Sequence, residues 1–155
     1  MRIEDRENHW LKSRYLSVGY YVLVKYGKIQ IRPNVGEELD WFGLNELPEL
    51  YLDHEEIIKK AIKSIRNDVG YIPIGYELLQ SKFTMPELRT IYETILGREL
   101  DRRNFQRKML STGLIIPLNE TRREGAHKSP NLYSFNKERY IEAREQGMQL
   151  MHVIL

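Results

Sequence analysis

Residues 101–113 hold the side chains whose types and spacing are best suited to recognising a ligand. Arg103 and Arg107 are four residues apart, so in a helix they share the face opposite Phe105. Three further polar residues flank that face: Asn104, Lys108 and Ser111. Arginine can pair bidentately with guanine and asparagine with adenine, so this face suits a DNA groove. A solvated basic face on an ordinary helix pair is the alternative interpretation.

A first predicted helix precedes this face and would help to position it. Thr84 with Glu87 three residues later forms a capping box, and Pro86 fits the first turn, where a missing N–H costs little. The apolar residues repeat at i, i+3, i+4, i+7 and i+8, which makes one buried stripe: Leu88, Ile91, Tyr92, Ile95 and Leu96. Gly97 ends the helix, because glycine adopts the left-handed conformation at little cost.

The second predicted helix follows a turn of about four residues. Asp101 can cap its start and Gly113 can end it. Phe105 and Met109, with Leu110 beside them, form its core side. Two short helices joined by such a turn predict a helix-turn-helix.

A hairpin is predicted directly after the helix pair. The strand-like runs 114–118 and 132–135 enclose a polar tip at 122–130, and a hairpin in this place is a wing. Three basic side chains of the tip would contact DNA phosphates, which adds affinity but does not distinguish one DNA sequence from another: Arg122, Arg123 and Lys128. A solvent-exposed turn that is merely basic is the alternative.

Composition sets the broad class of the protein. The chain has 155 residues, enough for one domain or two small ones, with 41% hydrophobic and 30% charged residues. It has no cysteine, which excludes disulfides and thiolate metal sites. No run approaches the ~18 apolar residues of a membrane span, and the first 15 residues are too charged for a secretory signal. We expect a cytoplasmic protein without a membrane partner.

The net charge of +2 is unevenly distributed. Between residues 37 and 56 there is no Lys or Arg and there are eight acids: Glu37, Glu38, Asp40, Glu46, Glu49, Asp53, Glu55 and Glu56. Between residues 102 and 128 there are two acidic residues, Glu120 and Glu124, and seven basic residues: Arg102, Arg103, Arg107, Lys108, Arg122, Arg123 and Lys128. The second segment should attract DNA and the first should avoid it.

The first half of the chain predicts strands and one helix. Residues 18–24 form a near-continuous apolar run that predicts a strand buried on both faces, and 29–31 predict a shorter one. Asp53, with Glu56 three residues later, should cap a helix. We expect five residues to form its buried face: Ile57, Ile58, Ala61, Ile62 and Ile65. Consecutive helical residues point in different directions, so the acids and histidine at 53–56 favour capping over a metal site.

The remaining segments complete the expected organisation. The Gly- and Pro-containing stretch 67–73 predicts a junction, and 74–83 predict a short helical turn beneath the helix pair. Asn136 should cap a last helix over 137–146, with Tyr140 and Ile141 facing the core. The apolar tail 148–155 is expected to dock on the body or on a second subunit. No nucleophile or metal-ligand spacing includes any of the histidines: His9, His54, His127 and His152.

Several of these segments resemble one family. The run Phe-Thr-Met-Pro-Glu-Leu at 83–88 and the run Leu-Gly-Arg-Glu-Leu-Asp-Arg-Arg-Asn-Phe at 96–105 look like the winged helix of the Nudix-related transcriptional regulators, NrtR and its sugar-responsive relatives. Trp41-Phe42, the Asn-Glu-Leu-Pro run at 45–48 and Asp53-His54 resemble the end of the Nudix domain in those proteins. The resemblance runs from about residue 15 to residue 135.

The resemblance implies a fold and a set of site residues. It implies an α+β fold, in which a partial, truncated Nudix-like β/α unit at 1–70 precedes a winged helix-turn-helix at 71–155. Six residues match the family's DNA-reading helix: Arg102, Arg103, Asn104, Gln106, Arg107 and Lys108. Three match its wing: Arg122, Arg123 and Lys128. The implied protein is a homodimeric repressor or activator that binds a palindromic double-stranded DNA operator and responds to an ADP-ribose-like nucleotide or a sugar such as arabinose.

The chain departs from the family in its first half. A Nudix hydrolase needs the pattern Gly-x5-Glu-x7-Arg-Glu-hydrophobic-x-Glu-Glu-x-Gly, whose glutamates bind Mg²⁺, and no such stretch exists here. We therefore expect no metal site, no cofactor and no enzyme activity. The chain begins where the family's Nudix domain is more than half over, so we expect a truncated or degenerate relative. A strand at 18–24 without its neighbours should pair with a second copy, which predicts a dimer.

Three hypotheses follow from the sequence. The first is a dimeric, ligand-responsive DNA-binding regulator in which Arg103, Asn104 and Arg107 read the major groove. The second is a Nudix-type ADP-ribose pyrophosphohydrolase, against which the missing glutamate pattern argues. The third is a winged-helix module that docks onto protein, which would tolerate loss of Arg103 and Arg107 without losing DNA affinity.

Overall fold

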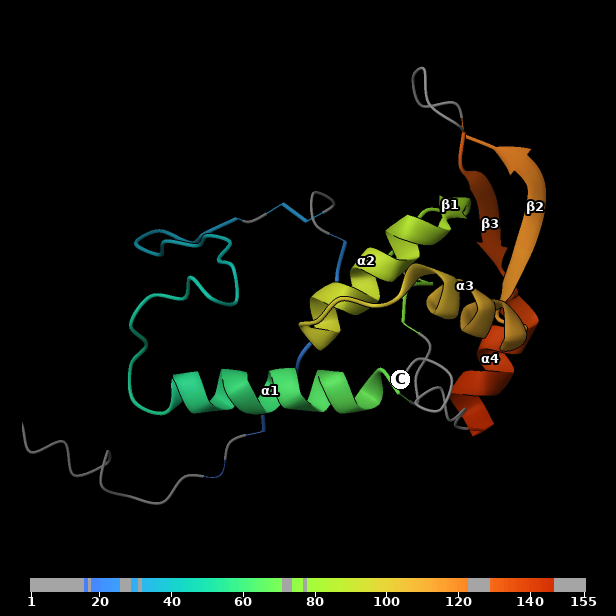
Figure 1. Ribbon diagram of the computed structural model, residues 1–155. Coiled ribbons are helices and arrows are strands. Elements are labelled where there is room, and N and C mark those ends of the chain that lie inside the picture. The colour runs from blue at the N-terminus through green and yellow to red at the C-terminus, as the bar shows by residue number, and fades with distance from the viewer. Residues whose placement is uncertain are drawn as a thin grey trace, which may run out of the picture.

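The computed structural model of the chain describes residues 16, 18–25, 29–30, 32–70, 74–76, 78–122 and 129–146. Within these residues the elements are, in order, α1 (His54–Asp68), β1 (Phe83–Thr84), α2 (Met85–Leu96), α3 (Arg102–Ser111), β2 (Ile115–Thr121), β3 (Asn131–Phe135) and α4 (Lys137–Gln146). Figure 1 shows α2, α3, α4 and the sheet packed into one body, with α1 against α2 on the side away from the strands.

Helix α2 begins and ends where its local signals predict. The Thr84 backbone N–H donates to Glu87 Oε2 over 2.7 Å, and the Glu87 N–H donates to Thr84 Oγ1 over 3.4 Å, so the capping box is present. Gly97 follows the last turn with φ 68° and ψ 27°, the left-handed conformation that a Cβ would strain. Both predicted boundaries are confirmed.

Helix α3 completes the predicted helix-turn-helix. The Asp101 side chain accepts a hydrogen bond from the Asn104 backbone N–H over 2.7 Å and caps the helix. Gly113, with φ 71°, lies just beyond its end. Phe105 and Met109 are buried and Leu110 is partly buried, as the periodicity predicts. The opposite face is therefore left to solvent.

The core lies between α2, α3, α4 and the sheet. The rings of Tyr92 and Phe105 meet edge to face, with centroids 5.5 Å apart, and so hold α2 against α3. Leu88 and Tyr92 have no exposed surface. Burial of these large apolar side chains fixes the angle between the helices, because cores are packed too densely to let them slide.

The wing is a hairpin in a three-stranded antiparallel sheet of order β1-β3-β2. Ile115 lies opposite Phe135 and Pro117 opposite Tyr133, with an irregularity in register between Pro117 and Thr121. The short strand β1 adds Phe83 opposite Tyr133. The predicted hairpin is confirmed, whereas residues 123–128 of its tip lie outside the described residues.

Helix α4 confirms one predicted core residue and corrects another. Asn136 Oδ1 accepts from the Arg139 backbone N–H over 3.1 Å, so the predicted cap is present. Tyr140 and Ala143 are buried, three residues apart on one face. Ile141 is 45% exposed, so the prediction that it faces the core is wrong. One step along a helix turns the side chain by about 100°, which carries Ile141 away from the face of Tyr140.

The predicted strand at 18–24 is wrong. The described residues of this segment have no strand, and Val18 and Val22 are 70% and 77% exposed. A strand needs a ladder partner, and within the described part of the chain no strand precedes α1 to supply one. The segment is held instead by the Tyr21 hydroxyl, which donates to the Asp68 carboxylate of α1. Ile29 and Gln30 are not a strand either, and Ile31 lies outside the described residues.

Helix α1 begins at the predicted place without the predicted cap. The Asp53 side chain makes no capping hydrogen bond, because its φ of −96° and ψ of 10° differ from the extended conformation of a cap residue. None of the α1 residues is fully buried, and Ile57 is 40% exposed. The predicted apolar face is therefore only partly covered, by α2 and the segment before α1.

Other predictions concern short segments. The Leu79 N–H bonds to the Gly75 carbonyl over 2.9 Å, which agrees with the predicted helical turn at 74–83. In the part of the chain that the structure describes, no group of His, Asp and Glu could hold a metal ion, and no helix is long and apolar enough to cross a membrane. The predicted tail at 148–155 and the N-terminal residues 1–15 lie outside the described part.

Candidate nucleic-acid interface

The exposed face of α3 presents two arginines, and a neighbouring side chain orients one of them, Arg107. Arg103 and Arg107 are exposed, as predicted for the face opposite Phe105. Arg107 Nη2 donates to Asn104 Oδ1 over 2.8 Å. Since the Asn104 backbone is in turn held by the Asp101 cap, the guanidinium is oriented from the first turn of the helix. The structure thus brings Asn104 and Arg107 together as one donor surface.

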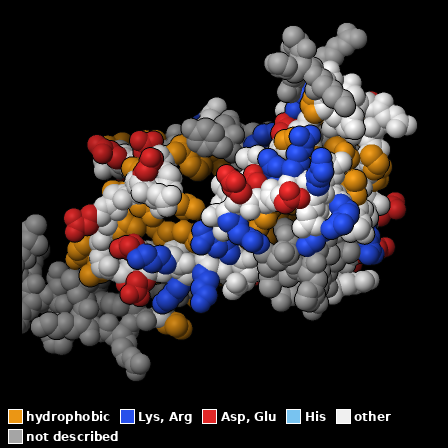
Figure 2. Space-filling model, viewed as in Figure 1, with side chains coloured by type: hydrophobic (Ala, Val, Ile, Leu, Met, Phe, Trp, Pro, Cys, Tyr) orange, Lys and Arg blue, Asp and Glu red, His pale blue; other side chains and the backbone are white. Residues whose placement is uncertain are grey.

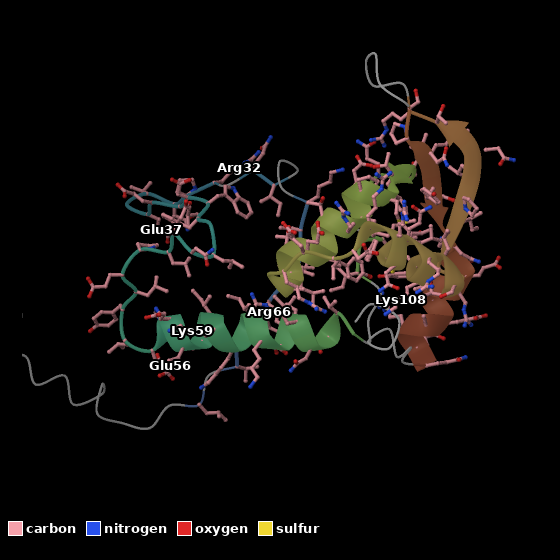
Figure 3. All side chains as sticks on the ribbon, viewed as in Figure 1. Arg32, Glu37, Glu56, Lys59, Arg66 and Lys108 are labelled. Carbon is pink, nitrogen blue, oxygen red and sulfur yellow. The ribbon has the colours of Figure 1, made fainter. Side chains whose placement is uncertain are left out.

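The remaining predicted residues of α3 lie at the edges of this face. Gln106 is partly buried and its Nε2 donates to the Tyr133 hydroxyl over 3.3 Å, so it points to the sheet. Arg102 is exposed at the first turn, and Lys108, labelled in Figure 3, is partly exposed on α3. Gln106 therefore links α3 to β3, whereas the contact of Arg102 and Lys108 with DNA stays a prediction.

A groove of about 620 Å³ lies between α2, α3 and the base of the wing. Nine residues line it: Met85, Pro86, Arg89, Arg102, Gln106, Ser129, Pro130, Asn131 and Tyr133. Two cations and several amide or hydroxyl groups in one open groove can bind a phosphodiester strand, which needs positive charge and hydrogen-bond donors together. Arg89 and Asn131 are absent from the predicted site, because only the folded chain brings the start of α2 to the base of β3.

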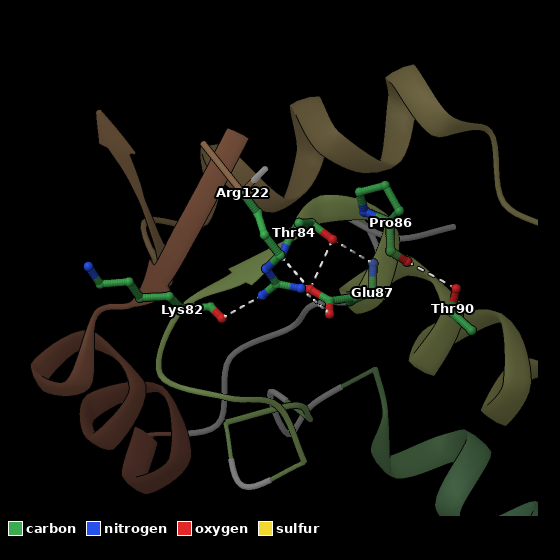
Figure 4. A network of polar contacts seen from close by, with 6 residues as sticks. All are labelled: Lys82, Thr84, Pro86, Glu87, Thr90 and Arg122. Carbon is green, nitrogen blue, oxygen red and sulfur yellow. Dashed lines mark hydrogen bonds and ion pairs between the residues drawn. The ribbon is translucent and has the colours of Figure 1, made fainter. Parts of the chain in front are cut away.

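Arg122, predicted at the wing tip, is held at the wing base by several bonds. Its Nη1 atom lies 2.7 Å from Glu87 Oε1, and its Nη2 atom donates to the Lys82 carbonyl over 3.1 Å (Figure 4). These bonds give Arg122 a structural role between β2 and α2, and its phosphate contact stays a prediction. Arg123 and Lys128 lie outside the described residues.

Glu87 is the centre of this network. Partial burial is the strongest single influence on its pKa and raises it, but the Thr84 backbone N–H, the Arg122 guanidinium and the Thr84 hydroxyl together outweigh burial. The pKa of Glu87 therefore lies below its ordinary value. The carboxylate is ionised wherever the protein is folded near neutral pH, and its charge holds Arg122.

The charge asymmetry of the sequence is visible on the surface. Figure 2 shows Lys and Arg side chains gathered over α3 and the end of α2, with acidic side chains over the segment that precedes α1. A DNA backbone would be drawn to the first region and repelled from the second. The exposed face of α3 and the groove beside it belong to the basic region.

Comparison with known proteins identifies relatives of the winged helix. Residues 75–135 match the family model of the NrtR DNA-binding winged helix domain. A curated relative, the "ADPR responsive transcriptional repressor NtrR" of Acinetobacter baylyi, is 28% identical over 127 residues, which are 81% of this chain and 50% of that protein. The resemblance to NrtR-like regulators predicted from the sequence is confirmed. The chain spans about half the length of this curated relative.

Two solved structures are also similar. Shewanella oneidensis NrtR complexed with a 27mer DNA is 26% identical, with a TM-score of 0.49, and the match covers 63% of this chain and 44% of that one. Shewanella oneidensis NrtR alone is 25% identical, with a TM-score of 0.47, over 59% and 41% of the two chains.

Proposed function

We propose that this chain, an NrtR-like protein by its winged helix at 75–135, is a dimeric, ligand-responsive transcriptional regulator that binds a specific DNA sequence. The observation that carries the proposal is the pair of Arg107 and Asn104 on the exposed face of α3, a helix that contacts β2 of the wing. An exposed arginine oriented by a neutral amide can form further hydrogen bonds with bases.

In this proposal α3 enters the major groove. Arg103 and Arg107 donate to guanine edges, and Asn104 fixes the guanidinium of Arg107 and can itself reach an adenine. Each arginine–guanine pair contributes about 1–3 kcal/mol of discrimination against other bases. Lys108 lies beside them, at the edge of the same face.

Phosphate contacts position α3 on the duplex. Arg89 and Arg102 line the groove between the helices and the wing, where one DNA strand can run. We assign Arg123 and Lys128 of the wing tip to phosphates as well, and Gln106 to positioning α3 against Tyr133. These contacts supply affinity and salt dependence, whereas the arginines of α3 supply sequence preference.

The first part of the chain has a different role. We divide the chain into residues 1–70, the remainder of a Nudix-like effector unit, and 71–155, the DNA-binding unit. The curated relative is named as an ADPR-responsive repressor, which supports repression and an ADP-ribose-like nucleotide as effector, with a sugar as the alternative. A regulator of this kind acts in the cytoplasm of a prokaryotic cell.

We also infer that the chain is not an enzyme. The glutamate pattern by which a Nudix hydrolase binds Mg²⁺ is missing from the sequence, which argues against hydrolysis of a pyrophosphate by that mechanism. Mg²⁺-dependent release of AMP from ADP-ribose by this chain would overturn that inference.

The proposal is tested by selecting duplexes from a random pool at ~150 mM salt, which suppresses purely electrostatic binding. The expected result is a palindromic motif, because a two-fold symmetric dimer presents two copies of α3. Sequence-specific recognition would be contradicted if no motif is enriched and the protein binds unrelated duplexes as tightly as the selected ones.

A further inference from the structure

A second basic surface lies outside the winged helix, in a cleft of about 540 Å³ between α1 and the end of α2. Helix α1 lines it with residues at i, i+3, i+4 and i+7: Lys59, Ile62, Lys63 and Arg66. Four residues complete the lining: Leu44, Asn45, Thr94 and Gly97. The α1 side of the cleft thus combines three cations with one apolar side chain.

A hydrogen bond joins this surface to the helix-turn-helix. Arg66 Nε donates to the Ile95 carbonyl over 2.9 Å, at the end of α2 where a cation is favoured by the helix dipole. Gly97 allows this close approach, because a Cβ built there would lie 3.0 Å from Arg66 Nη2. Arg66 therefore fixes the basic side of α1 relative to α2.

The same surface adjoins the start of α3. Gly97 lines the cleft, Arg98 follows it in the turn, and α3 begins at Arg102. The turn is braced by Glu93 Oε1, which accepts from the Leu100 N–H over 2.9 Å. Figure 2 shows Lys and Arg side chains over α1 on the same face of the molecule as those over α3, and Figure 3 places Lys59 and Arg66 along α1.

The lysines of this surface are exposed and can bind a phosphate in place of a carboxylate. Lys59 forms an ion pair with Glu55 over 2.5 Å, but the two side chains are 67% and 62% exposed. Exposed ion pairs contribute little to stability, so a phosphate can replace the carboxylate without a large cost. Lys63 is exposed in the same cleft, one helical turn further along.

We propose that Lys59, Lys63 and Arg66 of α1 bind phosphates of the DNA that flanks the bases read by α3. The inference rests on the proposed function and extends its DNA interface beyond residues 75–135. The chemistry that fits is a polyanion with regularly spaced charges, since the cations lie along one helix face and continue towards the basic turn and α3. Base-specific contacts are not expected here, because a backbone contact carries no sequence information.

The test uses the Lys59→Gln/Lys63→Gln protein and the duplex enriched by selection, in two lengths. One duplex is trimmed to the enriched positions and the other keeps flanks of about 10 base pairs, one helical turn, on each side. On the long duplex we expect about 10-fold weaker binding at ~150 mM salt, and a log–log salt slope smaller by about 1 for each lost phosphate contact. On the trimmed duplex the variant and the unaltered protein should bind equally.

The matched control is Lys60→Gln/Lys137→Gln, which removes the same charge from exposed residues outside the cleft and should bind both duplexes like the unaltered protein. Equal affinity of the Lys59→Gln/Lys63→Gln variant for the long duplex would overturn the α1 contact while leaving the proposed function intact. An equal loss of affinity for both duplexes would also overturn it, because the lost contact would then lie within the enriched positions and not in the flanking DNA. If the unaltered protein selects no motif, the proposed function fails, and this inference with it.

Discussion

Arg122 and Glu87 lie 35 residues apart in the sequence, and Nη1 of the arginine lies 2.7 Å from Oε1 of the glutamate. This pair joins the end of β2, where the wing tip begins, to the first turn of α2, whose capping box uses the same carboxylate. The wing is thereby oriented relative to the helix-turn-helix. If Arg122 affects DNA binding by orienting the wing, its effect requires the ion pair with Glu87.

The first prediction concerns this pair. Arg122→Gln and Glu87→Gln should each weaken binding of the selected duplex by about 3-fold, and the double variant should be no weaker than either, since the side chains act together. Glutamine also supports a capping box, so Glu87→Gln removes the ion pair and keeps the helix start. Titration of labelled duplex at fixed salt measures all four proteins.

A direct phosphate contact by Arg122 predicts a different pattern. Removing the negative charge of Glu87 would then leave DNA affinity unchanged or raise it, and that result would refute the positioning role. The control pair is Lys82 and Glu120, 2.6 Å apart with side chains 53% and 49% exposed. Its double-mutant cycle should show smaller coupling in stability than the roughly 0.5 kcal/mol expected for the less exposed Arg122–Glu87 pair.

The second prediction is a pH dependence of stability. The folded-state pKa of Glu87 is depressed, so the ionised carboxylate contributes stability that is fully present above the unfolded-state pKa of about 4.3 and is lost as pH falls through the folded-state value. Urea unfolding measured from pH 7 to acidic pH should show that the free energy of unfolding falls below about pH 5. The fall should be smaller in Glu87→Gln than in the unaltered protein. If the free energy of unfolding changes with pH in the same way in both proteins, the folded-state pKa of Glu87 is not depressed.

The third prediction concerns the start of α2. Thr84 is 5% exposed and its hydroxyl takes part in the capping box, so Thr84→Ala should lower the free energy of unfolding by about 1 kcal/mol. Thr90→Ala is the matched control, because the Thr90 hydroxyl donates to the Pro86 carbonyl on an exposed part of the same helix and takes no part in the cap. Equal losses in the two variants by chemical denaturation would mean that the cap is not used.

The sequence predicts the helix-turn-helix well because its signals are local. Thr84 and Glu87, Gly97 and Asp101 each act within a few residues, and the structure keeps each in the expected role. The side of α3 that faces solvent also follows from periodicity alone, because Phe105 fixes which face is buried.

Contacts between distant segments were beyond such reasoning. The partner of Arg122 is on α2, and Arg89 and Asn131 line the same groove only in the folded chain. Apolar content at 18–24 predicted a strand, but strands depend on a partner that no described segment before α1 provides. Asp53 had a capping sequence without the backbone angles that a cap requires.

The fourth prediction concerns association. Val18 and Val22 are 70% and 77% exposed, and we expect a second copy to cover them. The unaltered chain at about 10 µM should sediment as a dimer, since association would remove these apolar side chains from water. Val18→Lys/Val22→Lys should sediment as a monomer with an unchanged circular dichroism spectrum. The control Val35→Lys alters an equally apolar, fully exposed residue elsewhere and should stay dimeric; a monomeric unaltered chain would refute the interface.

The most direct test of DNA reading by α3 compares Arg103→Ala/Arg107→Ala with a control that loses the same charge, Arg32→Ala/Arg139→Ala. Arg32 lies before α1, remote from α3 in Figure 3, and Arg139 is on α4. Equilibrium titration of the selected duplex at ~150 mM salt should show at least about 100-fold weaker binding for the α3 variant and a loss of preference for the motif, with the control within about 2-fold of the unaltered protein. If the α3 variant keeps both the affinity and the motif, α3 does not read DNA and the winged helix serves another partner.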